Sequence, residues 1–502
     1  MSSSNPRDQK EPVDEELEED MLAADDAAEE IPEDEDMAMD SDNEEILLQN
    51  DSIGYFDEPK DSLFTIAQHP KYPSIIAVGG SAGQEDDAPG AGWVFNTASV
   101  QSRPPLPASF SSDPAADALK STQVSPLSSL DGHTDSINTL TWTLPRGDVL
   151  VSGGLDGRLR AWKATFLNDG QPIMDFLGEA QEVPEVNWLV PCPSSTNPNT
   201  VALGASDGSV WVYTIDPTDE ANSLQIVQSY FLHTGSCTAG AWTPDGLLLT
   251  TISEDGSLYV WDVWGEATAR NLIGDNGMTA VALTSDDQRF EVEGGLYSLA
   301  IDPKGAFVAV GGATGAIKIV SLPRLASTGA QPQARSQARG KNTSQSSSTP
   351  GGQILAALHT QSESIESLAI VTTPNTPPST LLAAGSVDGS IVVYDATRRF
   401  AVRRHISDAH EEHAIVKLEF IPNSWQLTSC GMDGVVRRWD LRGAGATNPN
   451  ATATAAEAGL QKEWKGHRGD GEGGGVLGFV QGQTGERIVT AGDDGVALIF
   501  EA

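Results

Sequence analysis

Histidines and a glycine-rich run are the parts of this sequence that could carry catalysis, a metal ion or a phosphate group. The run at residues 469–475 is not followed by the Gly-Lys-Ser/Thr of a phosphate-binding loop. The eight histidines include one cluster, made of His405, His410 and His413. No further metal ligands can be placed beside it, and a loop is the simpler interpretation. We therefore expect no catalytic residue, no metal site, no cofactor and no enzymatic activity.

The cysteines indicate neither a disulfide framework nor a zinc site. Cys192, Cys237 and Cys430 lie far apart, without the paired spacing of metal ligands. This use of cysteine is typical of a reducing compartment. No run of about 20 apolar residues is present to cross a membrane, and residues 1–10 lack the apolar run of a signal peptide. These features favour the cytoplasm, or both the cytoplasm and the nucleus.

The charge of the chain restricts its partners. There are 71 acidic and 30 basic residues, for a formal net charge of −41. The first 51 residues hold 21 of the acids, two basic residues and no aromatic residue, so we expect a disordered acidic tail over 1–51. The remainder still carries −22. Such a chain repels nucleic acid and anionic membranes and attracts cationic partners, so no direct contact with either is expected.

Candidate binding acids must be positioned by the elements around them, and these elements repeat. Six times an Asp-Gly turn is followed by an aromatic residue six positions after the Asp. The six pairs are Asp156 with Trp162, Asp207 with Tyr213, Asp255 with Trp261, Asp388 with Tyr394, Asp433 with Trp439, and Asp494 with Phe500. Two degenerate copies, one with Thr314 at the Asp position and one from Ile75 to Trp93, complete a set of eight.

These repeats resemble WD repeats, each of which forms a four-stranded propeller blade. The resemblance implies an all-β protein, an eight-bladed WD40 β-propeller over 52–502 that follows the disordered acidic tail. It also implies a hydrogen-bonded chain of His, Ser or Thr, Asp and Trp that holds each complete blade together. The residues assigned to this structural role are His133, Ser152, Asp156, Trp162, His233, Thr251, Asp255, Trp261, Asp433 and Trp439. Blades that lack the set are expected to depend more on packing.

The ends of the repeat region predict how the ring closes. The last repeat stops at Phe500, one strand short of a blade, and a spare strand lies at 52–56. We expect this strand to complete the last blade, which would remove the exposed edges of an open ring. Three inserts rich in Ser, Pro, Gly or Ala, at about 97–128, 323–352 and 443–459, are expected to be mobile loops.

The order of the non-identical repeats supports a closer resemblance. The chain is similar to the WD-repeat family of the angio-associated migratory cell protein, which includes the fungal dedicated chaperone of large-subunit ribosomal protein ten, the Sqt-type ribosome assembly protein. The segments that carry the resemblance are Tyr55-Phe56-Asp57 and Asp61-Ser62-Leu63-Phe64 in the first repeat, Glu185-Val186-Asn187-Trp188 in the third, 317–321 in the fifth, 364–368 in the sixth and 492–495 in the eighth. The acidic N-terminal segment fits the same pattern.

The resemblance implies a ribosome assembly chaperone. Such a protein would hold the basic N-terminal segment of a new large-subunit ribosomal protein, free or as a nascent chain on the ribosome, on an acidic face until incorporation. A body with a charge of −22 suits that task, and we expect it to act as a monomer. The alternative is a WD40 scaffold for signalling or cytoskeletal complexes.

The candidate client-binding acids precede the first strand of a repeat or lie beside an Asp-Gly turn, positions that share one rim of a propeller. They are Asp61, Asp135, Glu185, Glu254, Glu366 and Asp493. Each could equally be a solvated acid in a turn. Trp142, Trp188 and Trp242 could stack on a guanidinium, but we expect them to pack in the core.

Overall fold

The computed structural model describes residues 49–502, apart from 84, 86–87, 103–120, 168–169, 220, 275, 326–348, 443–457 and 469–473. The chain divides into two units, Met1–Leu47 and Leu48–Ala502, and all described residues belong to the second. The tail expected at 1–51 therefore lies outside the described residues except for its last three. The central parts of the three expected inserts also lie outside them.

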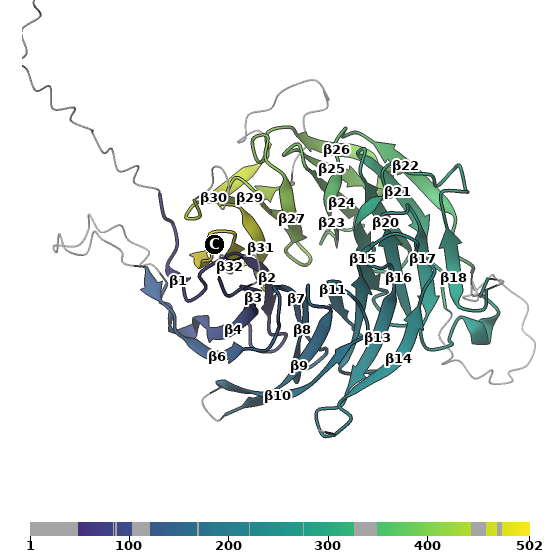
Figure 1. Cartoon of the computed structure of the whole chain (residues 1–502). Helices are drawn as coiled ribbons and strands as arrows, with labels where there is room; N and C mark the ends of the chain where they lie inside the picture. The colour runs from purple at the N-terminus through teal and green to yellow at the C-terminus, as the bar shows by residue number, and fades with distance from the viewer. Residues whose placement is uncertain are drawn as a thin grey trace, which may run out of the picture. The chain divides into compact units, whose positions relative to one another are not determined.

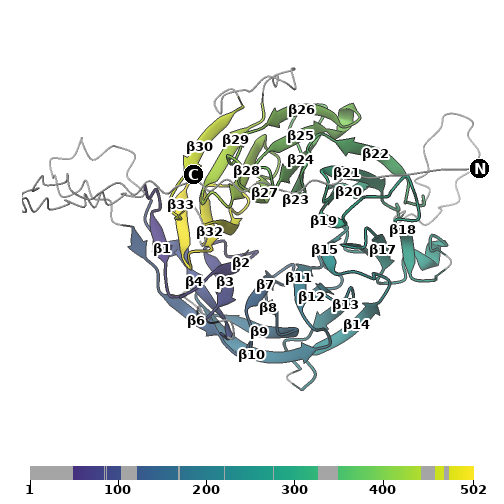
Figure 2. The same cartoon turned by 45° about the horizontal axis from the view of Figure 1, so that its top comes forward.

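The described residues form eight sheets arranged as the blades of a ring (Figures 1 and 2), and the four strands of each blade are antiparallel to their neighbours. Blade 1 consists of β2 (Leu63–Gln68), β3 (Ile75–Ser81), β4 (Gly90–Asn96) and β6 (Pro126–Leu130), and blade 2 of β7 (Ile137–Trp142), β8 (Val149–Gly154), β9 (Arg158–Phe166) and β10 (Pro172–Gln181). Blade 3 consists of β11 (Val186–Pro191), β12 (Thr200–Ala205), β13 (Val210–Ile215) and β14 (Leu224–Tyr230), and blade 4 of β15 (Cys237–Trp242), β16 (Leu248–Ser253), β17 (Leu258–Asp262) and β18 (Thr279–Leu283).

Blades 5 to 8 continue the same order from the axis outward. Blade 5 consists of β19 (Leu296–Ile301), β20 (Phe307–Gly312), β21 (Ala316–Ser321) and β22 (Ile354–His359), and blade 6 of β23 (Ile365–Thr372), β24 (Thr380–Ser386), β25 (Ile391–Asp395) and β26 (Ala401–Ile406). Blade 7 consists of β27 (Ile415–Phe420), β28 (Gln426–Gly431), β29 (Val436–Asp440) and β30 (Leu460–Trp464), and blade 8 of β31 (Val476–Val480), β32 (Arg487–Gly492), β33 (Ala497–Glu501) and β1 (Gly54–Phe56). In the described part of the chain, three short 3-10 helices follow third strands of blades: η1 (Thr97–Ser99), η4 (Thr268–Arg270) and η5 (Ala396–Arg398). The predicted eight-bladed all-β propeller is confirmed.

The first strand of the described chain closes the ring. β1 pairs antiparallel with β33, with Gly54 opposite Ile499, and supplies the fourth strand of blade 8 where the sequence places a strand at 52–56. A short strand, β5 (Thr122–Gln123), then pairs parallel with β1. Both ends of the propeller therefore lie in one sheet, which leaves no blade short of a strand among the described residues.

Two strands overlap the range 97–128 that the sequence assigns to a loop. They are β5 and β6, and η1 occupies the start of the same range. β6 reads Pro-Leu-Ser-Ser-Leu and has little apolar alternation, because an outermost strand packs against one neighbour only. Strand propensity alone therefore does not predict β6, whereas the need for a fourth strand in blade 1 does.

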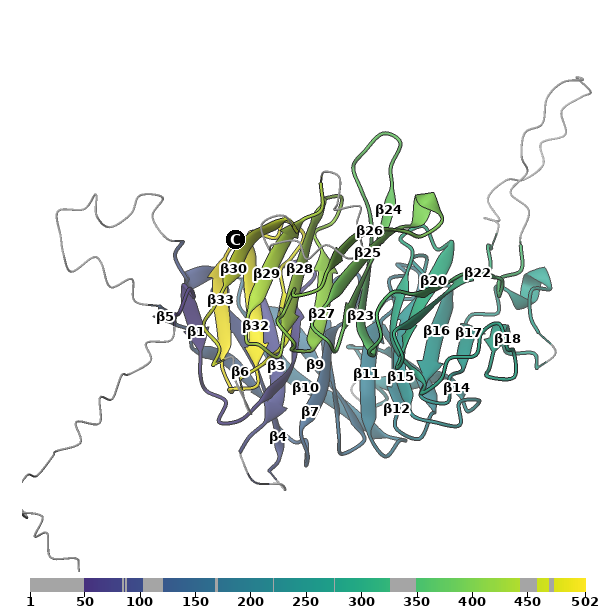
Figure 3. The same ribbon diagram turned by 90° about the horizontal axis from the view of Figure 1, so that it is seen from above.

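The second strand of each blade is sandwiched between neighbouring sheets. β8, β16 and β20 are buried along their whole length, because both faces of these strands are covered. The sheets stand side by side, so the connecting loops collect at two opposite faces of the ring (Figure 3). The core lies between the blades rather than at the axis.

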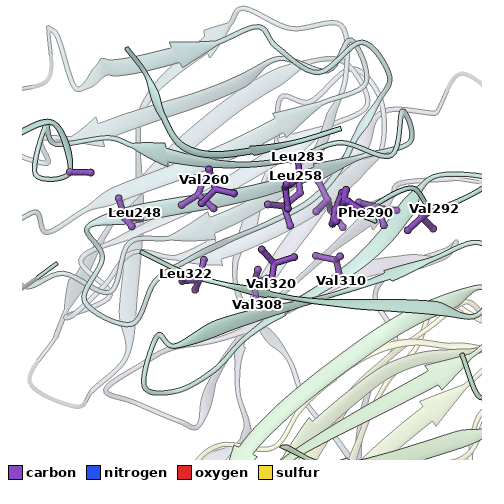
Figure 4. Close-up of a cluster of buried hydrophobic side chains, with 14 residues drawn as sticks. Leu248, Leu258, Val260, Leu283, Phe290, Val292, Val308, Val310, Val320 and Leu322 are labelled. Atoms are coloured by element: carbon purple, nitrogen blue, oxygen red, sulfur yellow. The ribbon is translucent and has the colours of Figure 1, made fainter. Parts of the chain in front are cut away.

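Blade 5 shows how a degenerate repeat folds. Val310 occupies the position of the Ser or Thr hydroxyl, and Val320 occupies the aromatic position. Val292 lies against Gly312, where histidines lie against the equivalent glycines of blades 2, 7 and 8. All three valines belong to one buried cluster with Leu258 and other residues of blade 4 (Figure 4). Apolar packing replaces the polar chain in this blade.

Candidate protein-binding face

One face of the ring is defined by a hydrogen bond that recurs in every blade. The residue at the end of the second strand, or directly after it, donates its N–H to the carbonyl of a residue just before the first strand, at N to O distances of 2.9 to 3.3 Å. The donor and acceptor pairs are Ser81 and Ser62, Leu155 and Ser136, Ser206 and Glu185, Glu254 and Ser236, Ala313 and Gly295, Val387 and Ser364, Met432 and Ala414, and Asp493 and Gly475. We call this side the Asp-Gly face, because the Asp-Gly turns lie on it.

All six candidate acids lie at this face. Glu185 and Glu254 belong to the recurring hydrogen-bonded pairs and are exposed. Among the described residues, their carboxylates have neither a hydrogen bond nor an ion pair. Glu366, in β23, is exposed and accepts a hydrogen bond from the Ser364 hydroxyl at 2.5 Å. These three carboxylates therefore remain available to a cationic partner.

Two of these acids come close to a tyrosine that the sequence did not single out. Tyr297 is the second residue of β19 in blade 5, between the blades that carry Glu254 and Glu366. Its pKa is raised, first by burial and then by the negative charges of Glu254 and Glu366. Gly295, at φ 93°, lets the chain before β19 pass against the Glu254 backbone, because an added Cβ would lie 2.6 Å from the carbonyl oxygen of Glu254. The negative charges of acids from two blades thus act on one phenol.

The other three acids are half-buried and hydrogen-bonded. Asp61 and Asp135 each accept the N–H of the next residue, at 2.8 and 2.6 Å. Asp493 accepts the Ser62 hydroxyl at 2.6 Å, which links blades 8 and 1. Asp61 also lies beside the last Asp-Gly turn, since a Cβ on Gly495 would contact its backbone. Each of these carboxylates is partly engaged with the protein itself.

Blade 7 contains a complete polar chain beneath this face. His410 contacts Asp433 through Nδ1 at 2.9 Å and Ser429 through Nε2 at 2.7 Å, and the Trp439 indole donates to the same hydroxyl at 2.9 Å. Arg437 also pairs with Asp433, at 2.5 Å. The sequence identified Asp433 and Trp439 but treated His410 as part of a loop cluster. Its separation of 19 residues from Ser429, equal to that between His133 and Ser152, was the signal.

In blades 2 and 4 the polar chain departs from the expectation. His133 contacts Asp156 at 3.0 Å and Ser152 at 2.6 Å, but among the described residues Trp162 makes no hydrogen bond to Ser152. Its ring packs edge-on against Phe176 of the outer strand instead.

In blade 4, His233 reaches Asp255 through Ser257, with contacts of 2.6 and 2.5 Å, rather than directly. Thr251 joins His233 and Trp261 as expected, at 2.8 Å each. The inserted serine hydroxyl can accept and donate at once, so it bridges the two side chains.

Blade 8 has a chain that sequence reasoning missed. His467 contacts Asp494 at 3.0 Å and Thr490 at 2.7 Å. His467 precedes β31 by nine residues, because a glycine-rich segment intervenes, and this longer spacing hid its role.

Burial and hydrogen bonding shift the pKa values of these groups in opposite ways. Burial lowers the pKa of His233 to about 4, against a smaller raising effect from Asp255, and burial also lowers the pKa of His410. Burial acts to raise the pKa of Asp433, but the hydrogen bond and charge of His410 and the Arg437 guanidinium outweigh it. The pKa of Asp433 is therefore below its ordinary range. These histidines are neutral and these aspartates are ionised near neutral pH.

The described residues offer no alternative site of metal or thiol chemistry. No group of three or more His, Cys, Asp or Glu that could hold a metal ion occurs within them. Burial raises the pKa of Cys192 to about 11 and that of Cys430 to about 12, so neither thiol ionises at neutral pH. No helix in the described part of the chain is long and apolar enough to cross a membrane. Trp142, Trp188 and Trp242 are buried, which confirms core packing.

The comparisons with known proteins agree with this architecture. The family model described as WD domain, G-beta repeat matches residues 124–163, 224–262 and 352–395. The ribosome assembly protein SQT1 of Saccharomyces cerevisiae is 29% identical over 237 residues, which are 46% of each chain. The human angio-associated migratory cell protein is 22% identical over 373 residues, 74% of this chain and 68% of its own. The chain spans about half the length of the fungal curated relatives that it matches.

Crystal structures of Sqt1 from Chaetomium thermophilum are more similar. One is 54% identical with a TM-score of 0.76, over 91% of this chain and all of that chain. Another, of Sqt1 bound to the N-terminus of the ribosomal protein L10, is 54% identical with a TM-score of 0.75, over 90% of this chain and all of that chain. The resemblance predicted from the order of the repeats is confirmed.

Proposed function

This chain belongs to the family of the Sqt1 ribosome assembly protein, and we propose that it is a chaperone that binds the basic N-terminal segment of newly made ribosomal protein L10. The observation that carries the proposal is the 54% identity, over 90% of this chain, to an Sqt1 that was crystallised with that segment. The binding site is the Asp-Gly face, and the client remains there until it joins the large subunit.

The exposed acids explain how a basic segment is held. Glu185, Glu254 and Glu366 come from blades 3, 4 and 6, so a bound chain meets several carboxylates along its length. Because these side chains are already in water, pairing with Lys or Arg has a small desolvation cost and contributes about 0.5–1 kcal/mol per pair. Affinity then comes from many weak contacts and decreases with salt.

The charge of the whole body supports capture and selectivity. Residues 52–502 carry −22, which steers a cationic segment towards the protein and raises the association rate. RNA has the same sign of charge as the protein and is repelled from it. The client segment is thereby shielded from RNA while it is held.

The proposal describes a binding protein without catalytic chemistry that acts as a monomer in the cytoplasm, where ribosomal proteins are made. Purification of the tagged chain from translating cells, followed by mass spectrometry, tests it. We expect L10 to dominate, as free protein and as nascent chains, and to be released by high salt. A set of signalling or cytoskeletal proteins without L10 would contradict the proposal and support a scaffold.

A further inference from the structure

Every inner strand begins with the same irregularity. After its first residue, one extra residue is inserted before pairing with the second strand resumes. The extra residues of blades 1 to 8 are Phe64, Asn138, Asn187, Thr238, Tyr297, Glu366, Val416 and Leu477. We call this set the bulge ring.

The bulge turns these side chains out of the ladder. The residue before each of them is fully buried in all eight blades, whereas Phe64 and Glu366 are exposed and the other six are half-buried. A bulge re-aims the side chain that it inserts. The inner strands surround the axis (Figure 2), and each bulge lies next to the recurring hydrogen bond that defines the Asp-Gly face. The bulge ring is therefore the innermost part of that face.

In blades 2, 3 and 4 the bulge ring holds the propeller together. Asn138 donates to the carbonyl of Asn187 at 3.1 Å, and Asn187 donates to that of Cys237 at 2.9 Å. Thr238 donates to the carbonyl of Leu296 at 2.6 Å. Each side chain thus joins its blade to the next one, and its donor group is used within the protein. These three positions are structural.

In blades 5 and 6 the bulge ring combines a phenol with a carboxylate. It consists there of Tyr297 and Glu366, and Glu254 at the neighbouring turn adds a second carboxylate beside the phenol. This sector suits a lysine or arginine side chain.

In blades 7, 8 and 1 the bulge ring is apolar. Val416, Leu477 and Phe64 follow one another around the axis, because β31 packs against both β27 and β2. The Phe64 side chain is 38% exposed, although burying it would be favourable. Half-buried Met432 lies at the turn of blade 7, against Gly475, and offers a flexible thioether next to this sector. Asp61 and Asp493 flank it at Ser62.

We propose that the Asp-Gly face recognises an apolar side chain as well as basic ones, and that Phe64, Leu477 and Val416 form the subsite for it. The inference rests on the proposed function, and the occupant is the same N-terminal segment of L10. The apolar sector is continuous with the acidic positions that would bind that segment, so one extended chain can meet both. A purely electrostatic face would select any basic peptide, whereas this one requires a large apolar residue among the basic residues.

The two kinds of contact respond differently to salt, which makes the inference testable. The affinity for a synthetic N-terminal peptide of L10 is measured by fluorescence anisotropy at several salt concentrations. For Phe64→Ala and for Leu477→Ala we expect binding about tenfold weaker at every salt concentration, with an unchanged salt slope. For the double variant Glu254→Gln, Glu366→Gln we expect the slope itself to decrease. Phe176→Ala, at an exposed phenylalanine of the outer strand β10, is the matched control and should bind like the unaltered protein.

The peptide supplies the second half of the test. Its apolar residues are replaced by alanine one at a time. One of these replacements should weaken binding to the unaltered protein, whereas the Phe64→Ala variant should bind that altered peptide as tightly as it binds the original peptide. Equal affinity of Phe64→Ala, Leu477→Ala and the unaltered protein at all salt concentrations would overturn the inference while leaving the proposed function intact. No binding of the peptide to the unaltered protein is a different result, which would overturn the proposed function itself.

Discussion

Acids at the Asp-Gly face occupy two regions with opposite properties. Asp433, in the turn of blade 7, has a side chain that is 6% exposed and is engaged by His410 and Arg437. Glu254, at the rim above blade 4, is exposed, and its carboxylate has no hydrogen bond or ion pair among the described residues. The first acid stabilises a blade, and the second is available to a partner. An enclosed turn acid such as Asp433 is therefore a poor candidate for binding, and changes in the two regions should affect different properties.

The largest expected effect is on folding, from Asp433→Ala. Removal of this carboxylate leaves the buried Arg437 and His410 without their partner, so we expect the free energy of unfolding to fall by about 3–5 kcal/mol. Chemical denaturation measures it. Asp388→Ala is the matched control, because Asp388 occupies the same turn position in blade 6 but bonds only the N–H of Ser390 within the described structure. There we expect about 1 kcal/mol. Equal losses of unfolding free energy at the two positions would remove the distinction between the enclosed Asp433 and the half-buried Asp388.

Acid should weaken the folded state through the buried His233 of blade 4. The pKa of His233 is about 4 in the folded protein, against 6.5 when unfolded, so the unfolded chain binds more protons between these values. Stability is fully present above pH 6.5 and falls as the pH decreases to 4, by about 3 kcal/mol for this residue. Thermal unfolding of His233→Gln should show a shallower decline than the unaltered protein over this window. If the stability of both proteins declined in parallel over this pH window, the lowered pKa assigned to His233 would be contradicted.

Changes at the rim should alter binding and leave folding intact. For Glu254→Gln combined with Glu366→Gln, we expect roughly tenfold weaker binding of the L10 peptide, because two exposed charge pairs are lost. The free energy of unfolding should stay within about 0.5 kcal/mol of its original value, since both side chains are exposed. Loss of stability together with binding would show that these acids are structural as well.

Asp493 lies between the two regions and should show the smallest effect. Its carboxylate accepts the Ser62 hydroxyl at 2.6 Å but remains half-buried rather than enclosed. In Asp493→Asn the amide oxygen can still accept that hydrogen bond, so we expect a two- to threefold loss of binding and little loss of stability. If Asp493→Asn lost more binding than the double variant at Glu254 and Glu366, the centre of the binding site would instead lie at the boundary between blades 8 and 1.

The repeat pattern predicted the architecture because each blade requires the same four strands and the same turn. Even blade 5, in which valines replace the polar chain, keeps the phase of the pattern through Gly315 and the flanking apolar strands. His467 was missed because the number of residues before β31 differs from that in the other blades. The outer strand β6 has little apolar periodicity, so the predicted loop at 97–128 extended over its first three residues.

The site was only partly predictable. The six acids could be placed at one face, because the turn and the start of the inner strand are linked in every blade. Which of them are engaged could not be predicted, since partners such as Ser62 for Asp493 come from a different blade. The bulge ring had no sequence signal, because its eight residues share no chemistry and only strand register reveals the extra position.

The most direct test of the central claim is the affinity of the L10 N-terminal peptide for a variant with four rim acids reversed, Asp135→Lys, Glu185→Lys, Glu366→Lys and Asp493→Lys. Calorimetry measures the binding, and the unfolding transition confirms that the variant is folded. We predict that this variant loses binding, whereas the unaltered protein binds with an affinity that falls steeply with salt. Undiminished binding by the folded variant would contradict the assignment of the client to the Asp-Gly face.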